Sequence, residues 1–362
     1  MEACTSSSRP EETRIETLPT QFTTAVSNVT ISDDKERRAI AAHTEVRELL
    51  EADATLKSWD ITPLLIGSYG RQTARYPGKD VDIFLRFLNL GIAFDPAVVY
   101  DEVSRVLLAE YGHVDDGGRV TPQPRSLKVD FASPNAQADL AFSVDAVPAV
   151  PWGRDWAIPN RDRSTWQNEA DRWVRTNPVA FGEASQALST SDKSPVVNGR
   201  NAYKPIVRLL RQVRHVHLGE AKPGGLYVEV AVYEAWQNGR VTGDSWAELF
   251  ASSLYEVSRI FLTAAGDGLL DPILRTPLKP ALETSDCLHA SRTFGALAAD
   301  AEEALRATPC AAAKTWRNIL GTNDRGQVFP LPDGCSGSGV PVPAVAAVSA
   351  NGPTRARGFA LR

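Results

Sequence analysis

The stretch 61–87 reads ITPLLIGSYGRQTARYPGKDVDIFLRF, and it decides the fold. Its first part is typical of a short apolar strand that runs into a glycine turn at GSYG. DVDIFLRF alternates as a second strand does, with Asp80, Asp82, Phe84 and Arg86 on one face and Val81, Ile83 and Leu85 on the other. Side chains two residues apart on a strand point to the same side. The sequence therefore predicts that Asp80 and Asp82 stand side by side on one face, while the other face is apolar and packs into a core.

Paired carboxylates of this kind favour a metal site. Two adjacent carboxylates repel each other, which raises the pKa of one of them unless a cation lies between them. Mg²⁺ prefers carboxylate, water and phosphate oxygens. A two-metal site, in which one ion activates an attacking hydroxyl and the other steadies a leaving group, needs a third carboxylate. Our choice is Asp145 in FSVDAVPA, since it points away from Phe142 and Val144; Asp130 and Asp139 are the competitors, and we interpret both as ordinary strand or turn acids.

The glycine turn upstream of the acids has the composition of a phosphate site. Gly67 lets the backbone approach a phosphate closely. If a helix starts after it, Ser68 can donate its hydroxyl to the anion. Arg71 either adds a positive fork or serves as a structural ion-pair partner. The simpler interpretation of the acids, a β-hairpin with an exposed acidic face, is weakened by this turn.

A second basic feature lies further along the chain. Lys204, Arg208, Arg211 and His215 recur at helical spacing, so they form a stripe on one helix face. Such a stripe either contacts a triphosphate or is a solvated face. Two aromatic residues follow on the next predicted helix, Tyr227 and Trp236; either could stack a base, and we favour a core position for Trp236.

The chain divides by composition into four parts. Residues 1–17 are polar and predicted to be disordered. Strand patterns dominate the region 18–190, which also contains a helix from about Ser32 to Leu50, with Ser32 as its cap. Helical periodicity dominates 191–330, and the Gly, Ser, Pro and Ala content of 331–362 predicts a flexible tail.

Bulk composition excludes several classes of protein. The net charge of −5 disfavours a general nucleic-acid coat protein. The N-terminus has no signal-peptide pattern and the apolar runs are too short to span a membrane, so we expect a cytoplasmic protein that does not bind membranes. Four scattered cysteines without metal-ligand spacing indicate reduced thiols: Cys4, Cys287, Cys310 and Cys335.

Several of these segments together resemble one family. GSYGRQTARYPGKDVDIF is similar to its GS-plus-DxD signature, SVDAVPAV to the segment with the third metal-binding acid, and YKPIVRLLRQVR to its helix of triphosphate contacts. LYVEVAVYEAW, LLDPI and KTWRNILG resemble landmarks of its helical lobe. The chain thus resembles the cGAS/DncV-like nucleotidyltransferases (CD-NTases, with a SMODS domain), bacterial relatives of cyclic GMP-AMP synthase and oligoadenylate synthetase.

The resemblance implies an α+β fold, with a polymerase-β-like core of mixed sheet and helices, a helical C-terminal lobe, and an active site in the cleft between them. It implies two Mg²⁺ ions, with Mn²⁺ as an alternative, on Asp80, Asp82 and Asp145, the last of which would draw the proton from the attacking hydroxyl. The residues implied for binding the nucleotide are Gly67, Ser68, Arg71, Lys204 and Arg211.

The implied reaction joins nucleoside triphosphates, ATP expected among them, into a cyclic di- or trinucleotide with release of pyrophosphate. In this family the product is a second messenger that activates an effector protein in anti-phage (CBASS) defence. The resemblance also suggests a regulatory protein that acts on the enzyme or on its C-terminal tail, and it leaves a nucleic-acid activator open. The alternatives are a transferase with linear products, a protein-modifying nucleotidyltransferase of the antitoxin kind, and an inactive nucleotide-binding scaffold.

Overall fold

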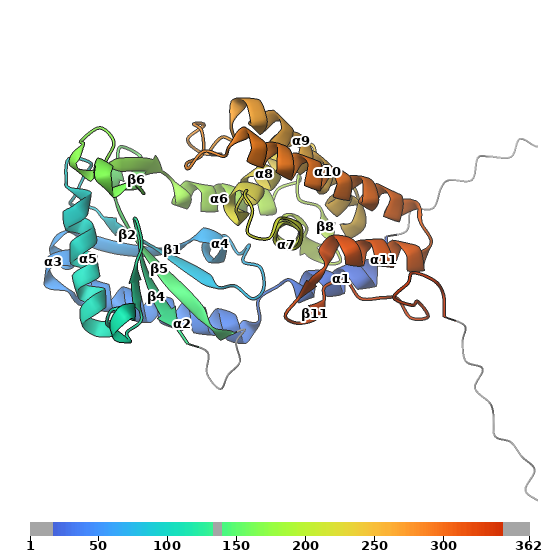
Figure 1. The fold of residues 1–362 in the computed structure, drawn as a ribbon, viewed down its shortest axis with the longest axis horizontal. Helices are drawn as coiled ribbons and strands as arrows, with labels where there is room; N and C mark the ends of the chain where they lie inside the picture. The colour runs from blue at the N-terminus through green and yellow to red at the C-terminus, as the bar shows by residue number, and fades with distance from the viewer. Residues whose placement is uncertain (1–16, 133–139, 343–362) are drawn as a thin grey trace, which may run out of the picture.

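The computed structural model describes residues 17–132 and 140–342, which form a sheet lobe and a helical lobe (Figure 1). The predicted disorder of residues 1–16 and the competitor acid Asp139 lie outside the described residues, as does the part of the predicted tail from 343 to 362. In the described ranges, no helix is both long and apolar enough to cross a membrane.

A mixed seven-stranded sheet forms the first lobe, with the order β1-β2-β5-β4-β3 and with β6 and β7 added beyond the far half of β5. β2 and β5 run parallel, and the other neighbours are antiparallel. The strands are β1 (Ile61–Ile66), β2 (Asp80–Phe87), β3 (Val120–Pro122), β4 (Leu127–Phe131), β5 (Phe142–Trp152), β6 (Asp155–Pro159) and β7 (Trp173–Thr176).

Three helices cover one face of this sheet, namely α2 (Asp33–Ala52), α3 (Ala54–Ser58) and α5 (Pro96–Tyr111) (Figure 1). The predicted cap of α2 is confirmed, because the Ser32 side chain accepts from the backbone N–H of Lys35. The apolar face predicted for β2 is confirmed too, although Phe84 on the opposite face is also buried, against Trp156. The apolar face of β2 packs in the core between sheet and helices, where Val81, Ile83 and Leu85 are at most 1% exposed.

The second lobe is helical, as its periodicity predicted. Its long helices are α7 (Tyr203–Leu218), α8 (Gly225–Gln237), α9 (Trp246–Asp267), α10 (Thr284–Arg306) and α11 (Pro309–Leu320). α10 and α11 come from a single periodic segment that divides where Pro309 opens a new helix, the position at which proline is tolerated. The short elements are the 3₁₀ helices η1 (Val114–Asp116) and η4 (Arg163–Gln167), the one-turn helix α4 (Gly67–Gly70), and the hairpins β8–β9 (Val196–Val197, Arg200–Asn201) and β10–β11 (Thr322–Asn323, Gly326–Gln327).

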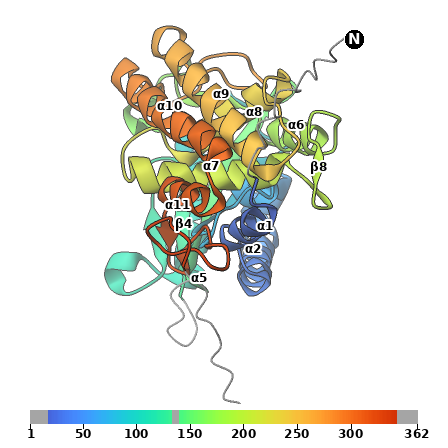
Figure 2. The same ribbon diagram turned by 90° about the vertical axis from the view of Figure 1, so that its right-hand side faces the viewer.

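The lobes do not follow the predicted boundary at residue 190. Helix α1 (Pro19–Asn28) packs in the core of the helical lobe, beside α11 (Figure 2). Its Phe22 is fully buried and meets the rings of Trp316 and Phe329 edge-on, each with centroids 5.0 Å apart. α6 (Pro178–Ser189) joins the same core through Phe181 and Leu188. Their positions in the sequence, next to the strands, suggested that α1 and α6 belong to the sheet lobe. In the structure, their apolar faces pack against the helical core instead.

The segment after α11 is held against the helical lobe. Phe329 is fully buried, and Cys335 forms a disulfide with Cys310 across a Cα–Cα distance of 5.3 Å. The prediction of reduced thiols is therefore wrong for this pair, while Cys287 is a buried free thiol and Cys4 lies outside the described residues. A spacing of 25 residues carries no motif, because a disulfide depends on how closely the fold brings two Cα atoms together.

Replacing Cys335 by serine is expected to lower the free energy of unfolding of the oxidised protein by roughly 3 kcal/mol. The physical reason is that the bond closes a loop of 25 residues and so restricts the unfolded chain. Urea denaturation with and without dithiothreitol measures the effect. Reductant should destabilise the wild type and leave the Cys335→Ser variant unchanged; equal curves for the wild type in both buffers would contradict the disulfide.

Candidate active site

The parallel pairing of β2 with β5 brings the predicted acids together. Asp82 is the register partner of Asp145, and Asp80 is the partner of Ser143. Register partners on adjacent strands share a face at the strand spacing of about 4.8 Å. The hydroxyl of Ser143 donates to Asp80 Oδ1 over 3.2 Å. The three acids chosen from sequence thus lie on one face of two central strands, whereas Asp130 on β4 forms an ion pair with Lys128.

The electrostatics of these acids fit a cation. Burial raises the pKa of Asp145 to about 7, with further contributions from the charges of Asp82 and Asp80. Burial likewise raises the pKa of Asp82, although the Arg71 guanidinium opposes this rise. Asp145 Oδ1 is buried and has no hydrogen-bond partner among the described residues. Several neighbouring carboxylates are costly to bury, so this donor set suits a bound divalent ion.

The carboxylates do not form a closed protein cage. Within 17–132 and 140–342, no three Asp, Glu, His or Cys side chains converge closely enough to hold a metal ion by themselves. Mg²⁺ does not need such a cage, because it keeps several waters and is commonly bound by one or two carboxylates together with substrate phosphates. The two-metal site on Asp80, Asp82 and Asp145 therefore stays a prediction.

The glycine turn is the short helix α4, which directly follows β1. Gly67 has a positive φ of 65°, and a Cβ at this position would lie 1.8 Å from Asp82 Oδ2. Any larger residue would displace the carboxylate of Asp82. The position therefore requires glycine for this reason as well as for the predicted close approach to a phosphate. Ser68 lies beside it in the cavity wall.

Arg71 is an ion-pair partner, the second of the two roles left open from sequence. Its Nε and Nη2 donate to the two carboxylate oxygens of Glu229 over 2.8 and 3.0 Å, in the bidentate geometry typical of arginine. The guanidinium also lies 4.8 Å from the centroid of the Phe181 ring, and only 6% of its side chain is exposed. Although Arg71 borders the cavity, its fork is engaged within the protein.

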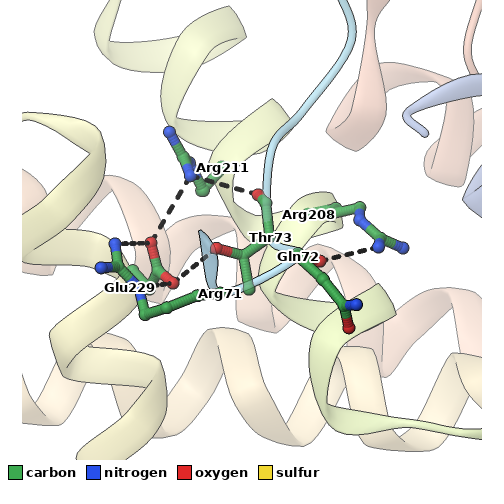
Figure 3. Close-up of polar contacts among 6 residues, drawn as sticks. All are labelled: Arg71, Gln72, Thr73, Arg208, Arg211 and Glu229. Atoms are coloured by element: carbon green, nitrogen blue, oxygen red, sulfur yellow. Dashed lines mark hydrogen bonds and ion pairs between the residues drawn. The ribbon is translucent and has the colours of Figure 1, made fainter. Parts of the chain in front are cut away.

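Residues of the basic stripe on α7 donate hydrogen bonds to the loop 71–73, which follows α4, and Figure 3 shows two of them, Arg208 and Arg211. Arg208 donates to the backbone oxygen of Gln72 over 2.7 Å, and Arg211 donates to that of Thr73 over 3.1 Å. Lys204 donates to the side chain of Gln72 over 2.8 Å. Lys204 and Arg208 are thus bonded within the protein, whereas Arg211 and His215 line the cavity.

A cavity of about 1390 Å³ lies between the lobes. Its wall combines the acids and the GS residues of the sheet lobe with residues of α7 and α8. Of the predicted binding residues, Gly67, Ser68, Arg71 and Arg211 line it and Lys204 does not. Lys204 is instead buried between loop and helix, so the predicted triphosphate contact has no geometric support.

Positive charge collects on one side of this cavity, and sequence reasoning missed most of it. Arg75, Lys79, Arg214 and His215 all line the wall. Burial lowers the pKa of His215, and the charges of Arg75, Arg214 and Lys79 lower it further. Burial together with Arg211 and Arg214 lowers the pKa of Arg75 to about 10. This side suits an anion, and the only sequence signal for it was the basic helix face next to Arg211.

The two aromatic candidates do not line the cavity. Trp236 is 1% exposed in the helical core, as we favoured, and its indole donates to the hydroxyl of Ser253. Tyr227 donates its hydroxyl to the backbone oxygen of Pro280. Other aromatic residues line the wall instead, among them Trp152 and Phe181.

Comparisons with known proteins agree with this arrangement. Residues 17–188 match the Second Messenger Oligonucleotide or Dinucleotide Synthetase domain, SMODS. A Cyclic AMP-AMP-AMP synthase of Acinetobacter sp. is 28% identical over 229 residues, which cover 60% of this chain and 59% of the relative. The chain thus spans about three fifths of the curated relative that it matches.

Solved structures share the fold over most of their length. The CD-NTase CdnG of Bradyrhizobium diazoefficiens, solved with GTP, has a TM-score of 0.62 at 16% identity, covering 83% of this chain and 94% of that one. CdnC of E. coli MS115-1, solved in a HORMA complex, has a TM-score of 0.58 at 14% identity, covering 86% and 98%. DncV of Vibrio cholerae has a TM-score of 0.52 at 14% identity, covering 84% and 80%.

The mixed sheet with its paired acids, the GS turn and the cavity beside a helical lobe are arranged in the fold of the solved CD-NTases. Residues 17–188 match the SMODS family model, and the solved structures that share the fold are CD-NTases. The resemblance and the fold class predicted from sequence are confirmed.

Proposed function

We propose that this protein is a metal-dependent nucleotidyltransferase that joins nucleoside triphosphates into a cyclic di- or trinucleotide. The observation that carries the proposal is the β2–β5 register, which places Asp80, Asp82 and Asp145 on one face of a large cavity between the lobes. Two bound Mg²⁺ ions would be held by these acids, where they would stabilise the charge that develops on the phosphates. Mn²⁺ is the alternative ion.

The residues divide the chemistry between them. A ribose hydroxyl of one nucleotide attacks the α-phosphorus of another, the new P–O bond forms, and the bond to the departing pyrophosphate breaks. We infer that Asp145, whose Oδ1 has no hydrogen-bond partner among the described residues, takes the proton of the attacking hydroxyl. Arg75, Lys79 and Arg214 supply the positive side of the cavity for the triphosphate. Further rounds within the same cavity each release one pyrophosphate, and the last round, in which the terminal hydroxyl attacks the α-phosphorus at the other end of the same oligonucleotide, closes the ring.

The size of the cavity supports the joining of two nucleotides. Pockets for one small molecule usually occupy about 300–1,000 Å³. The cavity here, at about 1390 Å³, exceeds that range, so donor and acceptor can lie in it together. Holding both reactants in line supplies much of the rate enhancement in phosphoryl-type transfers.

The relatives suggest substrates and partners. The Acinetobacter relative is a Cyclic AMP-AMP-AMP synthase, which favours ATP as a substrate and a trinucleotide ring as the product of this chain. The structure of CdnC with a HORMA protein supports a regulatory protein partner for this chain as well. We further propose that the product activates an effector protein in anti-phage defence, and that this occurs in the cytoplasm. The tail that a regulator would modify lies largely outside the described residues.

One experiment tests the proposed function directly. Purified protein is incubated with four radiolabelled nucleoside triphosphates and Mg²⁺ or Mn²⁺, then treated with phosphatase, and the products are resolved. A phosphatase-resistant product that disappears when EDTA is added supports a cyclic product, and omission of single triphosphates names its bases. Phosphatase-sensitive ladders would favour a linear transferase, and absence of any product would overturn the proposal for the isolated protein.

Lys79→Gln is expected to raise the KM for the nucleoside triphosphate about tenfold, whereas Lys204→Gln should leave this KM within about twofold of wild type. Lys79 lines the cavity next to Asp80, and a charge-assisted hydrogen bond to a phosphate is worth about 1.5–3 kcal/mol. Lys204 bonds to Gln72 and Gln186 within the protein. Initial rates over a range of ATP concentrations measure both. A larger rise in KM for Lys204→Gln than for Lys79→Gln would indicate that Lys204, and not Lys79, contacts the triphosphate.

A further inference from the structure

A single buried carboxylate connects the helical lobe with the loop beside the predicted metal site. Glu229 on α8 is fully buried and accepts hydrogen bonds from residues of two other elements (Figure 3). Arg71 donates twice, over 2.8 and 3.0 Å, and the hydroxyl of Thr73 donates over 2.6 Å. Arg211 on α7 donates over 3.5 Å. The carboxylate is therefore the point where α7, α8 and the loop 71–73 meet.

This cluster maintains its charge despite its burial. Burial alone would raise the pKa of Glu229, but Arg71, Arg211 and the hydroxyl of Thr73 hold it below the usual range. A buried ion pair adds little net stability, because desolvation offsets the attraction. What such a network does supply is one defined arrangement of its members, provided that each is satisfied. We therefore expect the Glu229 network to determine the position of the loop 71–73 more than the stability of the protein.

The loop 71–73 is hydrogen-bonded to the GS turn, so its position determines that of the turn beside Asp82. The backbone N–H of Arg71 donates to the oxygen of Gly67 over 3.1 Å, and that of Thr73 donates to the oxygen of Ser68 over 2.8 Å. Gly67 in turn leaves room for the Asp82 carboxylate with no space to spare. A shift of Thr73 therefore moves the GS turn and changes the space around Asp82.

We propose that Glu229 is a positioning residue, which holds Arg71 and Thr73 so that the GS turn and Asp82 keep their places relative to the helical lobe. The inference rests on the proposed function, because its catalytic consequence is a loss of alignment between the bound nucleotide and the acids. Loss of alignment affects the transition state more than the ground state, so kcat should fall while KM changes little.

Thr73 offers the sharpest test, since it is fully buried and does not line the cavity. Substitutions there reach the substrate only through the loop. Thr73→Val keeps the shape and removes the donor to Glu229, and it is expected to lower kcat about tenfold with KM within about twofold. Thr73→Ser keeps the hydroxyl and should restore kcat.

Two further variants examine the carboxylate itself. Glu229→Gln keeps the size but turns one acceptor toward the Arg71 donors into a donor, and we expect kcat to fall about 100-fold, as misplacement of reacting groups by about 1 Å does. Glu234→Gln is the matched control on the same helix, where the carboxylate forms an ion pair with Arg275 outside the cavity. The control should retain wild-type kcat and KM.

Hydrogen exchange separates this inference from the proposed function. Amides of the loop 71–73 should exchange about tenfold faster in Thr73→Val and at the wild-type rate in Thr73→Ser, whether or not the protein makes a cyclic product. Wild-type exchange and kcat in Thr73→Val would overturn the positioning role. A raised KM at unchanged kcat would also overturn it, because Glu229 would then act in binding. If the wild type forms no product, the proposed function fails, and the exchange rates alone decide the inference.

Discussion

Replacing Asp82 by asparagine is expected to lower kcat for nucleotide joining by about 10³-fold or more without loosening the fold. A metal ion that polarises a phosphoryl oxygen supplies several kcal/mol, and each 1.36 kcal/mol corresponds to a factor of about ten in rate. Asp82 lies at the centre of the predicted site, as the register partner of Asp145 and beside Gly67. An amide of the same shape cannot neutralise a divalent ion.

The fold should tolerate Asp82→Asn because the ionised carboxylate of Asp82 is less favourable in this buried position than a neutral side chain. Burial raises the pKa of Asp82, so its contribution to stability is present at low pH and is lost as the pH rises through the folded-state value. Asparagine removes that loss. The melting temperature of metal-free Asp82→Asn at pH 8 should therefore equal or exceed that of the wild type.

Product formation and thermal melting with and without Mg²⁺ measure both effects. Mg²⁺ should raise the melting temperature of the wild type, since an ion that binds only the folded state stabilises it, and should leave Asp82→Asn unchanged. Asp130→Asn is the control, because this acid lies on β4, where it pairs with Lys128 of the same strand. Near-normal turnover in Asp82→Asn would remove Asp82 from the metal site.

Phe22→Ala is expected to lower the free energy of unfolding by about 3–5 kcal/mol, the largest effect on stability that we predict for a single side chain. Phe22 is fully buried among Phe250, Trp316 and Phe329, so truncation leaves a cavity that rigid neighbours cannot fill. The helical lobe would lose its attachment to α1 at the same time.

Urea denaturation followed by tryptophan fluorescence measures this loss. Leu262→Ala on α9 is the control, since 58% of that side chain is exposed and its removal should cost less than about 0.5 kcal/mol. Equal midpoints for the two variants would show that α1 is not part of the helical core. Such a result would support the lobe boundary expected from sequence.

Local patterns were sufficient for the strands, the capped helix and the common face of the acids. The alternation along DVDIFLRF predicted both faces of β2, and Ser32 predicted the start of α2. The common face of Asp80 and Asp82 followed from the direction of side chains along one strand. In each case the physical cause acts within a few residues, so the sequence displays it.

Contacts between distant residues were beyond the same reasoning. The partner of Arg71 is separated from it by 158 positions, and no periodicity links the two. The place of α1, the Cys310–Cys335 bond and the buried position of Lys204 likewise depend on which elements meet in the folded chain. The resemblance to a family predicted the architecture, yet not which basic side chains face the cavity.

The route of the chain restricts how the cleft can open. The chain begins its described part in the helical lobe, passes into the sheet lobe after Val29, and returns between Val174 and Phe181. Two covalent crossings leave one easy rotation, about the line that joins them, and block twisting or sliding of the halves. The two lobes should therefore open and close about that line, and a short cross-link on the opposite side of the cleft would trap whatever ligand lies inside.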